Sequence, residues 1–367
     1  MALAVLGQTT GQSSGPWVLE RSGTTAGLRG IHAVGGGIAW ASGTNGTVLR
    51  TEDGGDEWQS CAMPPGAEKL DFRGIWAWDA NTAIVMSSGT GDLSRLYRTT
   101  DGCSSWKLLF TNPDKDGFWD AMAFLDRNSG YVLGDPTPNR TDSCPQVALQ
   151  VTLLATFDGG AHWDRQCEGP GELEVAAGTG AFAASNSALT LQEHEGWLGV
   201  GGRPGSDVLI GDFYGPVEHG LCDCAPMPPN RIWFTHRARV PITGGTSSSG
   251  VFSLAFRDSQ RGVAVGGDYT KSNESAGTAA WSADGGQTWT AAATPPHGFR
   301  SAVAWDPDAK AWIAVGTNGS DVSYDDGRTW VPLDNGNWNA LGLPWVVGPD
   351  GRIAKLDPGK LPRSAKK

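Results

Sequence analysis

An eight-residue pattern, Ser/Thr-x-Asp-x-Gly-x-x-Trp, recurs along this chain and limits the folds that it can adopt. Four copies match the pattern in full, and a fifth has Cys103 where glycine is expected. Successive aspartates are 48, 57, 126 and 41 residues apart, so the long interval predicts a degenerate copy between residues 164 and 280. Such a period is the signature of a repeat architecture. The octets occupy residues 51–58, 99–106, 156–163, 282–289 and 323–330.

Three further kinds of segment recur with the octets. Short apolar runs that end in glycine are typical of buried strands stopped by turns. A second kind of run precedes each octet, and residues 231–235 and 352–356 supply it in the hidden copy and in the last unit. A third kind alternates in size and polarity and is weakest at residues 180–189. Each unit thus predicts an inner, a second and a third strand, the octet and an outer strand, and seven units predict an all-β, seven-bladed β-propeller. The glycine-ended runs are residues 38–43, 83–89, 131–134, 197–202, 262–267, 312–316 and 345–348.

The last unit lacks an octet and an outer strand, whereas the N-terminal region has a spare strand. Residues 16–22 resemble residues 329–334, which follow the fifth octet. We therefore expect residues 17–20 to complete the seventh blade and to close the ring, which removes two exposed sheet edges. The predicted organisation is one propeller over residues 16–356 and a C-terminal tail, 357–367. Residues 1–15 are either a disordered tail or the remnant of a signal peptide.

The octets are expected to form hairpin turns in which glycines adopt positive φ and the aspartate accepts backbone N–H bonds. The tryptophan then packs on the turn and on the neighbouring blade. Calcium binding is the alternative, but each octet offers one or two carboxylates where calcium takes about six or more oxygens. We therefore predict no metal site. The residues given this structural role are Asp53, Asp101, Asp158, Asp284, Asp325, Trp58, Trp106, Trp163, Trp289 and Trp330.

The starts of the inner strands should ring the central channel on the face opposite the octets. Arginines that converge favour a planar anion such as a carboxylate. The predicted ligand-binding residues are therefore Arg29, Arg73, Arg300 and Asn339. The alternative is that each arginine pairs with an acid of a neighbouring blade or with a backbone carbonyl. The register positions are Arg29, Arg73, Asp120, Phe252, Arg300 and Asn339, with Phe182 as a weaker seventh.

Three loops between second and third strands are long and could form a wall around a site: residues 134–146, 202–230 and 267–277. A glycosidase uses two carboxylates, or a tyrosine with an acid partner. The candidates for catalysis, if the protein is an enzyme, are Asp120, Asp135, Asp268 and Tyr269. The alternative is that Asp135 and Asp268 cap their own loops.

Composition excludes several classes. A formal net charge of −11 argues against non-specific nucleic-acid binding. No apolar run approaches the roughly 20 residues of a membrane span. Six cysteines, an even number, favour disulfides in an exported protein over reduced thiols, and we expect Cys61–Cys103 and Cys144–Cys167. Residues 219–224 hold a His and two Cys without an evident fourth ligand, and no cofactor motif occurs, so no cofactor is predicted.

The octets resemble the Asp-boxes, or BNR repeats, of sialidases and other propellers. Over residues 16–356 the chain also resembles the photosystem II stability/assembly factor-like proteins, seven-bladed propellers found in many bacteria. The likeness is carried by residues 118–136, 251–269 and 315–330. It implies a scaffold that binds a membrane-protein precursor through an arginine patch, to which Arg29, Arg73 and Arg300 would correspond.

Two functions follow as hypotheses. The first is an exported, extracytoplasmic, monomeric and non-enzymatic assembly propeller that recognises a peptide or protein on the arginine-bearing face. The second is a glycoside hydrolase or lyase that acts on an acidic glycan at the same face. The arginine motif that sialidases carry near the N-terminus is absent here. Closely spaced carboxyls in a closed pocket would favour the enzyme.

Overall fold

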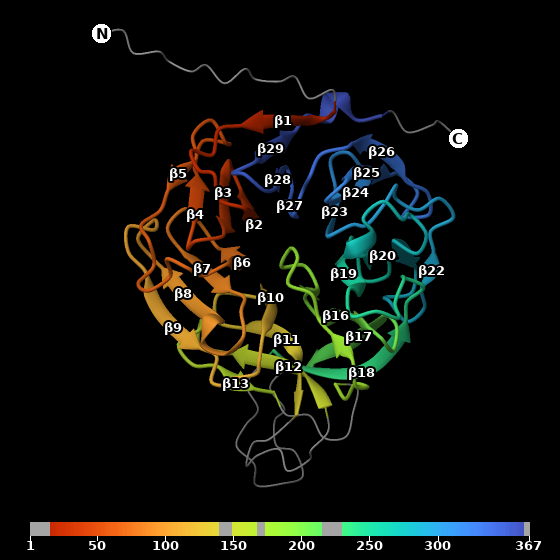
Figure 1. The fold of residues 1–367 in the computed structure, drawn as a ribbon, viewed down its shortest axis with the longest axis horizontal. Helices are drawn as coiled ribbons and strands as arrows, with labels where there is room; N and C mark the ends of the chain where they lie inside the picture. The colour runs from red at the N-terminus through yellow and green to blue at the C-terminus, as the bar shows by residue number, and fades with distance from the viewer. Residues whose placement is uncertain (1–14, 139–148, 167–172, 215–229, 363–367) are drawn as a thin grey trace.

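The computed structural model describes residues 15–138, 149–166, 173–214 and 230–362. Antiparallel sheets are arranged as seven blades around a central axis, with each inner strand at the centre and each outer strand at the rim (Figure 1). The fold class expected from the sequence, an all-β, seven-bladed propeller, is confirmed. Among the described residues, no helix is both long and apolar enough to cross a membrane.

The first three blades follow the expected strand order. Blade one holds β2 (Leu28–Gly35), β3 (Ile38–Gly43), β4 (Val48–Thr51) and β5 (Gln59–Ser60). Blade two holds β6 (Phe72–Ala77), β7 (Ala83–Ser87), β8 (Arg95–Thr99) and β9 (Lys107–Thr111), with the 3-10 helix η1 (Gly91–Leu93) between its second and third strands. Blade three holds β10 (Trp119–Phe124), β11 (Gly130–Pro138), β12 (Leu149–Thr156) and β13 (Asp164–Arg165).

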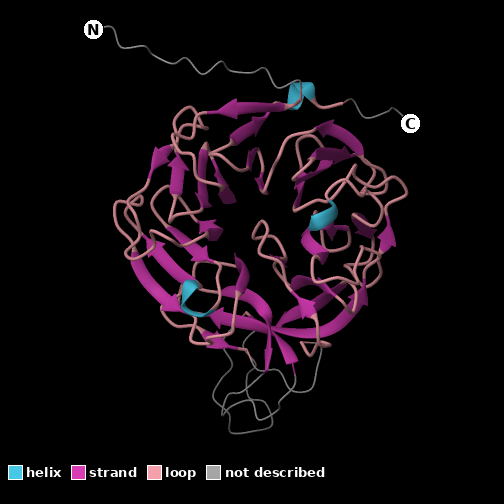
Figure 2. Cartoon of the chain, in the orientation of Figure 1, coloured by secondary structure: helices cyan, strands magenta, loops and turns pink. Residues whose placement is uncertain are grey.

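The last three blades repeat this order. Blade five holds β19 (Ser249–Phe256), β20 (Gly262–Asp268), the 3-10 helix η2 (Tyr269–Lys271), β21 (Ala279–Ser282) and β22 (Thr290–Ala291). Blade six holds β23 (Ala302–Asp306), β24 (Ala311–Gly316), β25 (Gly319–Ser323) and β26 (Val331–Asp334). Blade seven holds β27 (Ala340–Gly342), β28 (Trp345–Val347), β29 (Ile353–Leu356) and the N-terminal β1 (Trp17–Glu20), and η3 (Pro358–Lys360) follows β29. Figure 2 shows the three 3-10 helices as the only helical segments of the described chain.

Blade four departs from the prediction. Its strands are β14 (Thr179–Gly180) and β15 (Leu189–Leu191), then β16 (Glu195–Gly202), β17 (Asp207–Tyr214) and β18 (Arg231–Arg239). The expectation that residues 202–230 form one long loop was wrong, because β17 pairs with β18 along its whole length and with β16 from Asp207 to Asp212. Residues 231–235 therefore belong to the outer strand and not to the third one.

Blades four and five form one nine-stranded sheet through a single residue pair, Gly201 with Gly250. A Cβ atom on Gly201 would lie 2.4 Å from the Cα of Gly250. The strands β16 and β19 can therefore approach this closely only because both residues are glycine.

The N-terminal strand closes the ring. In β1, Trp17 lies opposite Leu356 and Glu20 lies opposite Ile353 of β29. Trp17 is 1% exposed and joins the apolar cluster between blades six and seven. Figure 1 shows both ends of the described chain beside this last blade.

The core of the molecule lies between blades. Seven apolar clusters of buried residues each join two neighbouring blades, as Trp40 of blade one and Ile75 of blade two do in one of them. Burial of apolar surface at every junction is what holds a closed ring of sheets together.

The octets form tight turns on one face. In the first octet, the Thr51 hydroxyl donates to Asp53 Oδ1 (2.8 Å) and accepts from the N–H of Gly55 (3.0 Å), and Asp53 Oδ1 also accepts from the N–H of Glu57 (3.1 Å). The other four octets repeat these three bonds. Each octet tryptophan packs into the cluster shared with the preceding blade.

A disulfide joins Cys61, just after β5, to Cys103 in the second octet, with 5.2 Å between the Cα atoms. The predicted Cys61–Cys103 pair is therefore confirmed, and it links blades one and two. Cys144, Cys167 and the residue 219–224 motif lie outside the described residues.

Candidate functional site

A β-bulge at the start of four inner strands presents one side chain at the mouth of the ring. The strand register shifts between the neighbours of each residue, in blades one, two, three and five. Such a bulge re-aims the extra residue away from the pleat. The four bulge residues are the predicted ring positions Arg29, Arg73, Asp120 and Phe252.

Arg29 and Arg73 share one carboxylate. The Arg73 Nε donates to Asp71 Oδ2 (2.8 Å), and the Arg29 Nε lies 3.9 Å from Asp71 Oδ1. The two arginine side chains are 34% and 28% exposed, so ligands can reach them. Burial lowers the pKa of Arg29, Asp71 opposes that effect, and the charge of Arg73 adds to it. Sequence reasoning missed Asp71, although it stands only two residues before Arg73.

The second charged group at the mouth is a pair of carboxyls in blade three. Asp120 is 2% exposed, and its Oδ2 atom is buried without a hydrogen-bond partner. Burial raises the pKa of Asp120 well above its ordinary value, the charge of Asp135 raises it further, and Arg73 partly offsets both. Asp135 is half-buried and its Oδ1 accepts from the N–H of Ala181 (3.0 Å). Burial also raises the pKa of Asp135.

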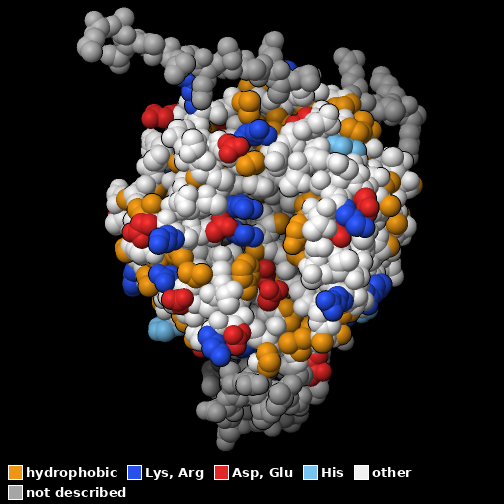
Figure 3. All heavy atoms as spheres, viewed as in Figure 1, with side chains coloured by type: hydrophobic (Ala, Val, Ile, Leu, Met, Phe, Trp, Pro, Cys, Tyr) orange, Lys and Arg blue, Asp and Glu red, His pale blue; other side chains and the backbone are white. Residues whose placement is uncertain are grey.

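Charged groups of both signs therefore lie side by side across three neighbouring blades. Two guanidinium groups and three carboxyl groups meet here, so the order of charge is positive, negative, positive, negative, negative. Figure 3 shows basic and acidic side chains close together near the centre of one face of the disc. The order along the blades is Arg29, Asp71, Arg73, Asp120 and Asp135.

Residues 181–188 of blade four, which we call the channel segment, cross the centre of the ring. The Asn186 Oδ1 accepts from the N–H of Met122 (2.7 Å), and its Nδ2 donates to the carbonyl oxygens of Met122 (2.9 Å) and Ile75 (3.4 Å). Ser185 donates to the carbonyl of Ser301 (2.6 Å), and Ser187 donates to the Ser253 hydroxyl (2.7 Å). Figure 1 shows this loop, before β16, reaching the middle of the ring. The expectation that residues 180–189 form a continuous inner strand was wrong, because these polar side chains bond to the inner strands of other blades.

The channel segment also positions the charged groups. Its Ala183 carbonyl accepts from the Arg73 Nη1 (3.2 Å), and its Ala181 N–H binds Asp135. Between them, Phe182 stacks on Phe252 with ring centroids 3.9 Å apart. Tyr269, which is 54% exposed, lies edge-on to Phe252 at 6.1 Å.

Arg300 does not belong to the mouth. Its side chain is fully buried and forms an ion pair with Asp321, whose side chain is also 0% exposed. It donates from Nη1 to the Phe299 carbonyl (2.6 Å) and to Asn318 Oδ1 (2.5 Å), and its Nη2 lies 2.8 Å from His297 Nδ1. The expectation of a ligand-binding Arg300 was therefore wrong, because this side chain is buried against an acid of its own blade and a backbone carbonyl.

The predicted residues Asn339 and Asp268 form hydrogen bonds within the protein. Asn339 is half-buried, and its Nδ2 donates to the Leu28 carbonyl (2.7 Å), which ties blade seven to blade one. Asp268 is 7% exposed and accepts from the N–H (3.0 Å) and hydroxyl (2.7 Å) of Thr270, so it caps η2. Although burial alone would raise the pKa of Asp268, the bonds from Thr270, Ser248 and Thr246 lower it.

The octet aspartates are occupied by their own turns. Bonds from the Ser105 hydroxyl and N–H and from Thr99 lower the pKa of Asp101 to about 2. The described part of the chain contains no group of three or more His, Cys, Asp or Glu side chains that could hold a metal ion.

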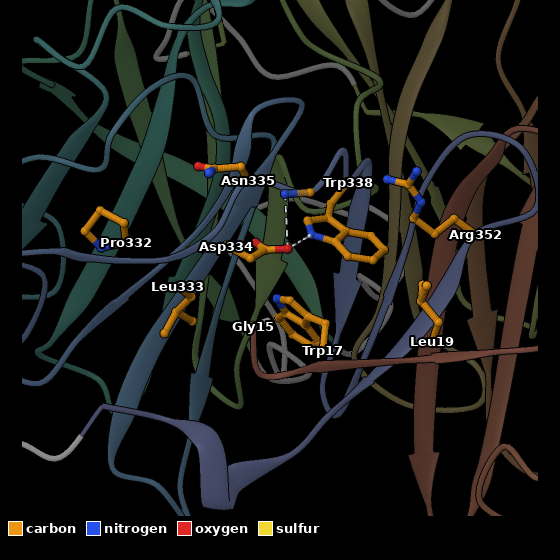
Figure 4. Close-up of a pocket in the computed structure, with 10 residues that line it drawn as sticks. Gly15, Trp17, Leu19, Pro332, Leu333, Asp334, Asn335, Trp338 and Arg352 are labelled. Carbon is orange, nitrogen blue, oxygen red and sulfur yellow. Dashed lines mark hydrogen bonds between the residues drawn. The ribbon is translucent and has the colours of Figure 1, made fainter. Parts of the chain in front are cut away.

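A pocket of about 520 Å³ lies at the rim, between the outer strands β26 and β1. Figure 4 shows Trp338 between Asp334 and Arg352. Asp334 Oδ2 accepts from the Trp338 Nε1 (3.1 Å), and the Arg352 guanidinium lies 5.5 Å from the centre of the Trp338 ring. None of the ring-mouth residues lines this pocket.

The fold defines the class: a seven-bladed propeller that resembles the photosystem II stability/assembly factor-like proteins. No family model matches the sequence. The chain is 23% identical over 329 residues to the photosystem II assembly lipoprotein Ycf48 of Synechococcus sp. (strain CC9902). The aligned region covers 87% of this chain and 78% of that protein.

Solved structures share the fold. The structure of YCF48 bound to D1 peptide has a TM-score of 0.57 and 16% identity, over 96% of this chain and 99% of that one. YCF48 from Cyanidioschyzon merolae has a TM-score of 0.60 and 17% identity, over 94% and 99% of the two chains. The predicted resemblance to this group of propellers is confirmed.

Proposed function

We propose that this protein is a non-enzymatic binding and assembly propeller that recognises a peptide or protein segment at the mouth of the ring. The observation that carries the proposal is the Arg29–Asp71–Arg73 group, in which two partly exposed guanidinium groups share one carboxylate. Guanidinium groups bind carboxylates through two parallel N–H bonds, which gives both energy and geometry. The ligand therefore carries an anionic group.

The comparisons support the same class of function. The Synechococcus relative is named as a photosystem II assembly lipoprotein, and one solved propeller of this fold is bound to a D1 peptide. An extracytoplasmic location is part of the proposal, and the Cys61–Cys103 disulfide supports it because such bonds persist in oxidising compartments. We also infer that the protein acts as a monomer.

The proposal is tested with an array of immobilised ten-residue peptides that vary in acidic content. The best binder is then measured by calorimetry against the wild type, Arg29→Gln and Arg73→Gln. We expect each variant to lose about tenfold in affinity, which corresponds to roughly 1.4 kcal/mol. Arg261→Gln is the matched control, because Arg261 lies on the octet face beside Asp258. The proposal fails if no peptide binds or if all three variants bind alike.

A glycan-active enzyme is the second candidate. The observation that favours it is the coupled pair of Asp120 and Asp135, since a carboxyl whose pKa is raised by burial and a neighbouring charge can serve as a general acid. Its test is turnover of a panel of acidic oligosaccharides by the wild type and by Asp120→Asn. Turnover that disappears in the variant would replace the binding function with an enzymatic one.

A further inference from the structure

The carboxyl groups of Asp120 and Asp135, at the blade-three side of the mouth, have oxygen atoms that could accept hydrogen bonds from a cation. Asp120 is placed by a bulge, and its Oδ2 is buried without a partner. Asp135 uses Oδ1 for the Ala181 N–H, and no ion pair to either carboxyl exists among the described residues. A buried carboxyl without a full set of partners is costly, so such a site favours a proton or a positively charged ligand.

The nearby arginines do not neutralise this end of the mouth. Arg73 directs its Nε to Asp71 and its Nη1 to the Ala183 carbonyl, and only its longer-range charge acts on Asp120. Arg29 lies on the far side of Asp71. The mouth is therefore dipolar, with spare positive charge at blade one and spare negative charge at blade three.

We propose that Asp120 and Asp135 form a cation-accepting half-site, so that the peptide bound here carries a lysine side chain close to its anionic group. This inference rests on the proposed function, because both halves belong to the same mouth. Half-buried Asp135 is the group that contacts the ammonium, whereas fully buried Asp120 stands behind it and supplies charge. A compact ammonium with three donors suits a half-buried carboxyl whose charge is reinforced by a second, fully buried one.

The linked protonation supports the same assignment. Burial raises the pKa of both carboxyls, and their mutual repulsion raises that of Asp120 further. A bound ammonium favours the ionised forms, so lysine binding should release a proton to the buffer. Two charged groups act on Asp120: the carboxyl of Asp135 and the guanidinium of Arg73 in blade two.

The test uses an acidic peptide that binds the wild type and two derivatives of it, in which one residue near the acid is either lysine or norleucine. Norleucine keeps the length of the side chain and removes the charge. We expect the wild type to bind the lysine peptide at least fivefold more tightly, and Asp135→Asn to lose that preference. Asp56→Asn, an exposed aspartate in the first octet, is the matched control and should keep it.

Calorimetry in two buffers of different ionisation enthalpy gives a second readout. Over a series of pH values above 3.8, the lysine peptide should release more protons than the norleucine peptide. Equal affinity of the wild type for the two peptides would overturn the inference and leave the arginine site standing, and this comparison needs no variant. The absence of binding by any acidic peptide would instead overturn the proposed function.

Discussion

Arg73 and Arg300 each follow a phenylalanine at the start of an inner strand, yet they have opposite environments. Arg300 finds Asp321 on β25 of its own blade, and burial of both side chains makes the pair part of the interior. A buried ion pair of this kind is costly to break, because the remaining charge is left without a partner. Arg73 finds Asp71 at the surface and stays accessible. The remote partner, not the local motif, decides which arginine can meet a ligand.

The buried Asp120 should make stability depend on pH. Its pKa in the folded protein is raised well above the 3.8 of an ordinary aspartate, so the folded state keeps a proton that the unfolded chain gives up. The stabilising effect is present below pH 3.8 and is lost as the pH rises through the folded pKa. We expect the wild type to lose stability relative to Asp120→Asn above pH 4, by up to about 1.4 kcal/mol per pH unit.

Urea unfolding of the two proteins at pH 4, 5, 6 and 7 measures this difference. Asp56→Asn serves as a control for removal of an exposed carboxyl. Parallel pH profiles for the wild type and Asp120→Asn would contradict the expected titration.

At the scale of elements, three junctions between blades reuse one contact. In each of them, the residue three positions after a tryptophan (Trp17, Trp58 or Trp106) reaches the fifth position of the next octet. Glu20 approaches Gly55, and Leu109 approaches Gly160, in each case within the space that a Cβ on the glycine would need. Cys61 and Cys103 occupy the same two positions and are covalently joined. Cys103 has φ of 64°, in the left-handed region that glycine occupies in the other octets.

This equivalence predicts that a second disulfide can be built between blades two and three. Leu109→Cys with Gly160→Cys should form a bond, since the Leu109 side chain lies 3.1 Å from the position that a Cβ on Gly160 would take, and the backbone of Gly160 is left-handed (φ 89°) as in Cys103. We expect a net gain of up to about 3 kcal/mol, because loop closure contributes about 2–4 kcal/mol and a non-glycine residue at positive φ costs about 1–2 kcal/mol.

Peptide mapping by mass spectrometry, with and without reductant, detects the new bond. Gly160→Cys alone is the control and should be less stable than the wild type. A double variant with free thiols after oxidation would show that the two junctions are not equivalent.

Sequence reasoning predicted the strands of every blade that carries an octet, and those of blade seven, but it failed in blade four. The octets fix the turn and hence the strands on either side. Blade four has no octet, and the glycines and proline of residues 201–205 gave its third strand the appearance of loop. The channel segment was misread because its hydrogen-bond partners, such as Met122 and Ser301, lie in other blades and far away in the sequence. The strand register alone predicted the bulge positions of Arg29, Arg73 and Asp120. The burial of Arg300 depends on its ion pair with Asp321, which no local sequence pattern indicates.

For the whole molecule, closure of the ring depends on one short strand. Glu20 of β1 accepts hydrogen bonds from the indole N–H groups of Trp58 (2.8 Å) and Trp345 (3.1 Å), so it joins blades one and seven. Trp17 fills the junction with blade six. Without β1, the edge of β29 and both junctions would be open to solvent.

Removal of residues 1–20 should therefore cause aggregation and a loss of cooperative unfolding, whereas removal of residues 1–14 leaves β1 intact and should not. Trp17→Ala is the milder variant and should cost about 3–5 kcal/mol. Light scattering and thermal unfolding followed by circular dichroism distinguish these cases. A fully stable, monomeric protein without residues 1–20 would show that the ring does not need its N-terminal strand.

The pairing of β1 with β29 also sets an order of events during synthesis. Glu20 leaves the ribosome about 330 residues before its partner Ile353. At roughly 5–20 residues per second, this first-made strand stays unpaired for about 15–70 s. The nascent chain therefore exposes Trp17, which is buried only in the closed ring, until β29 has been made, and β1 completes the disc although it is made before the other strands.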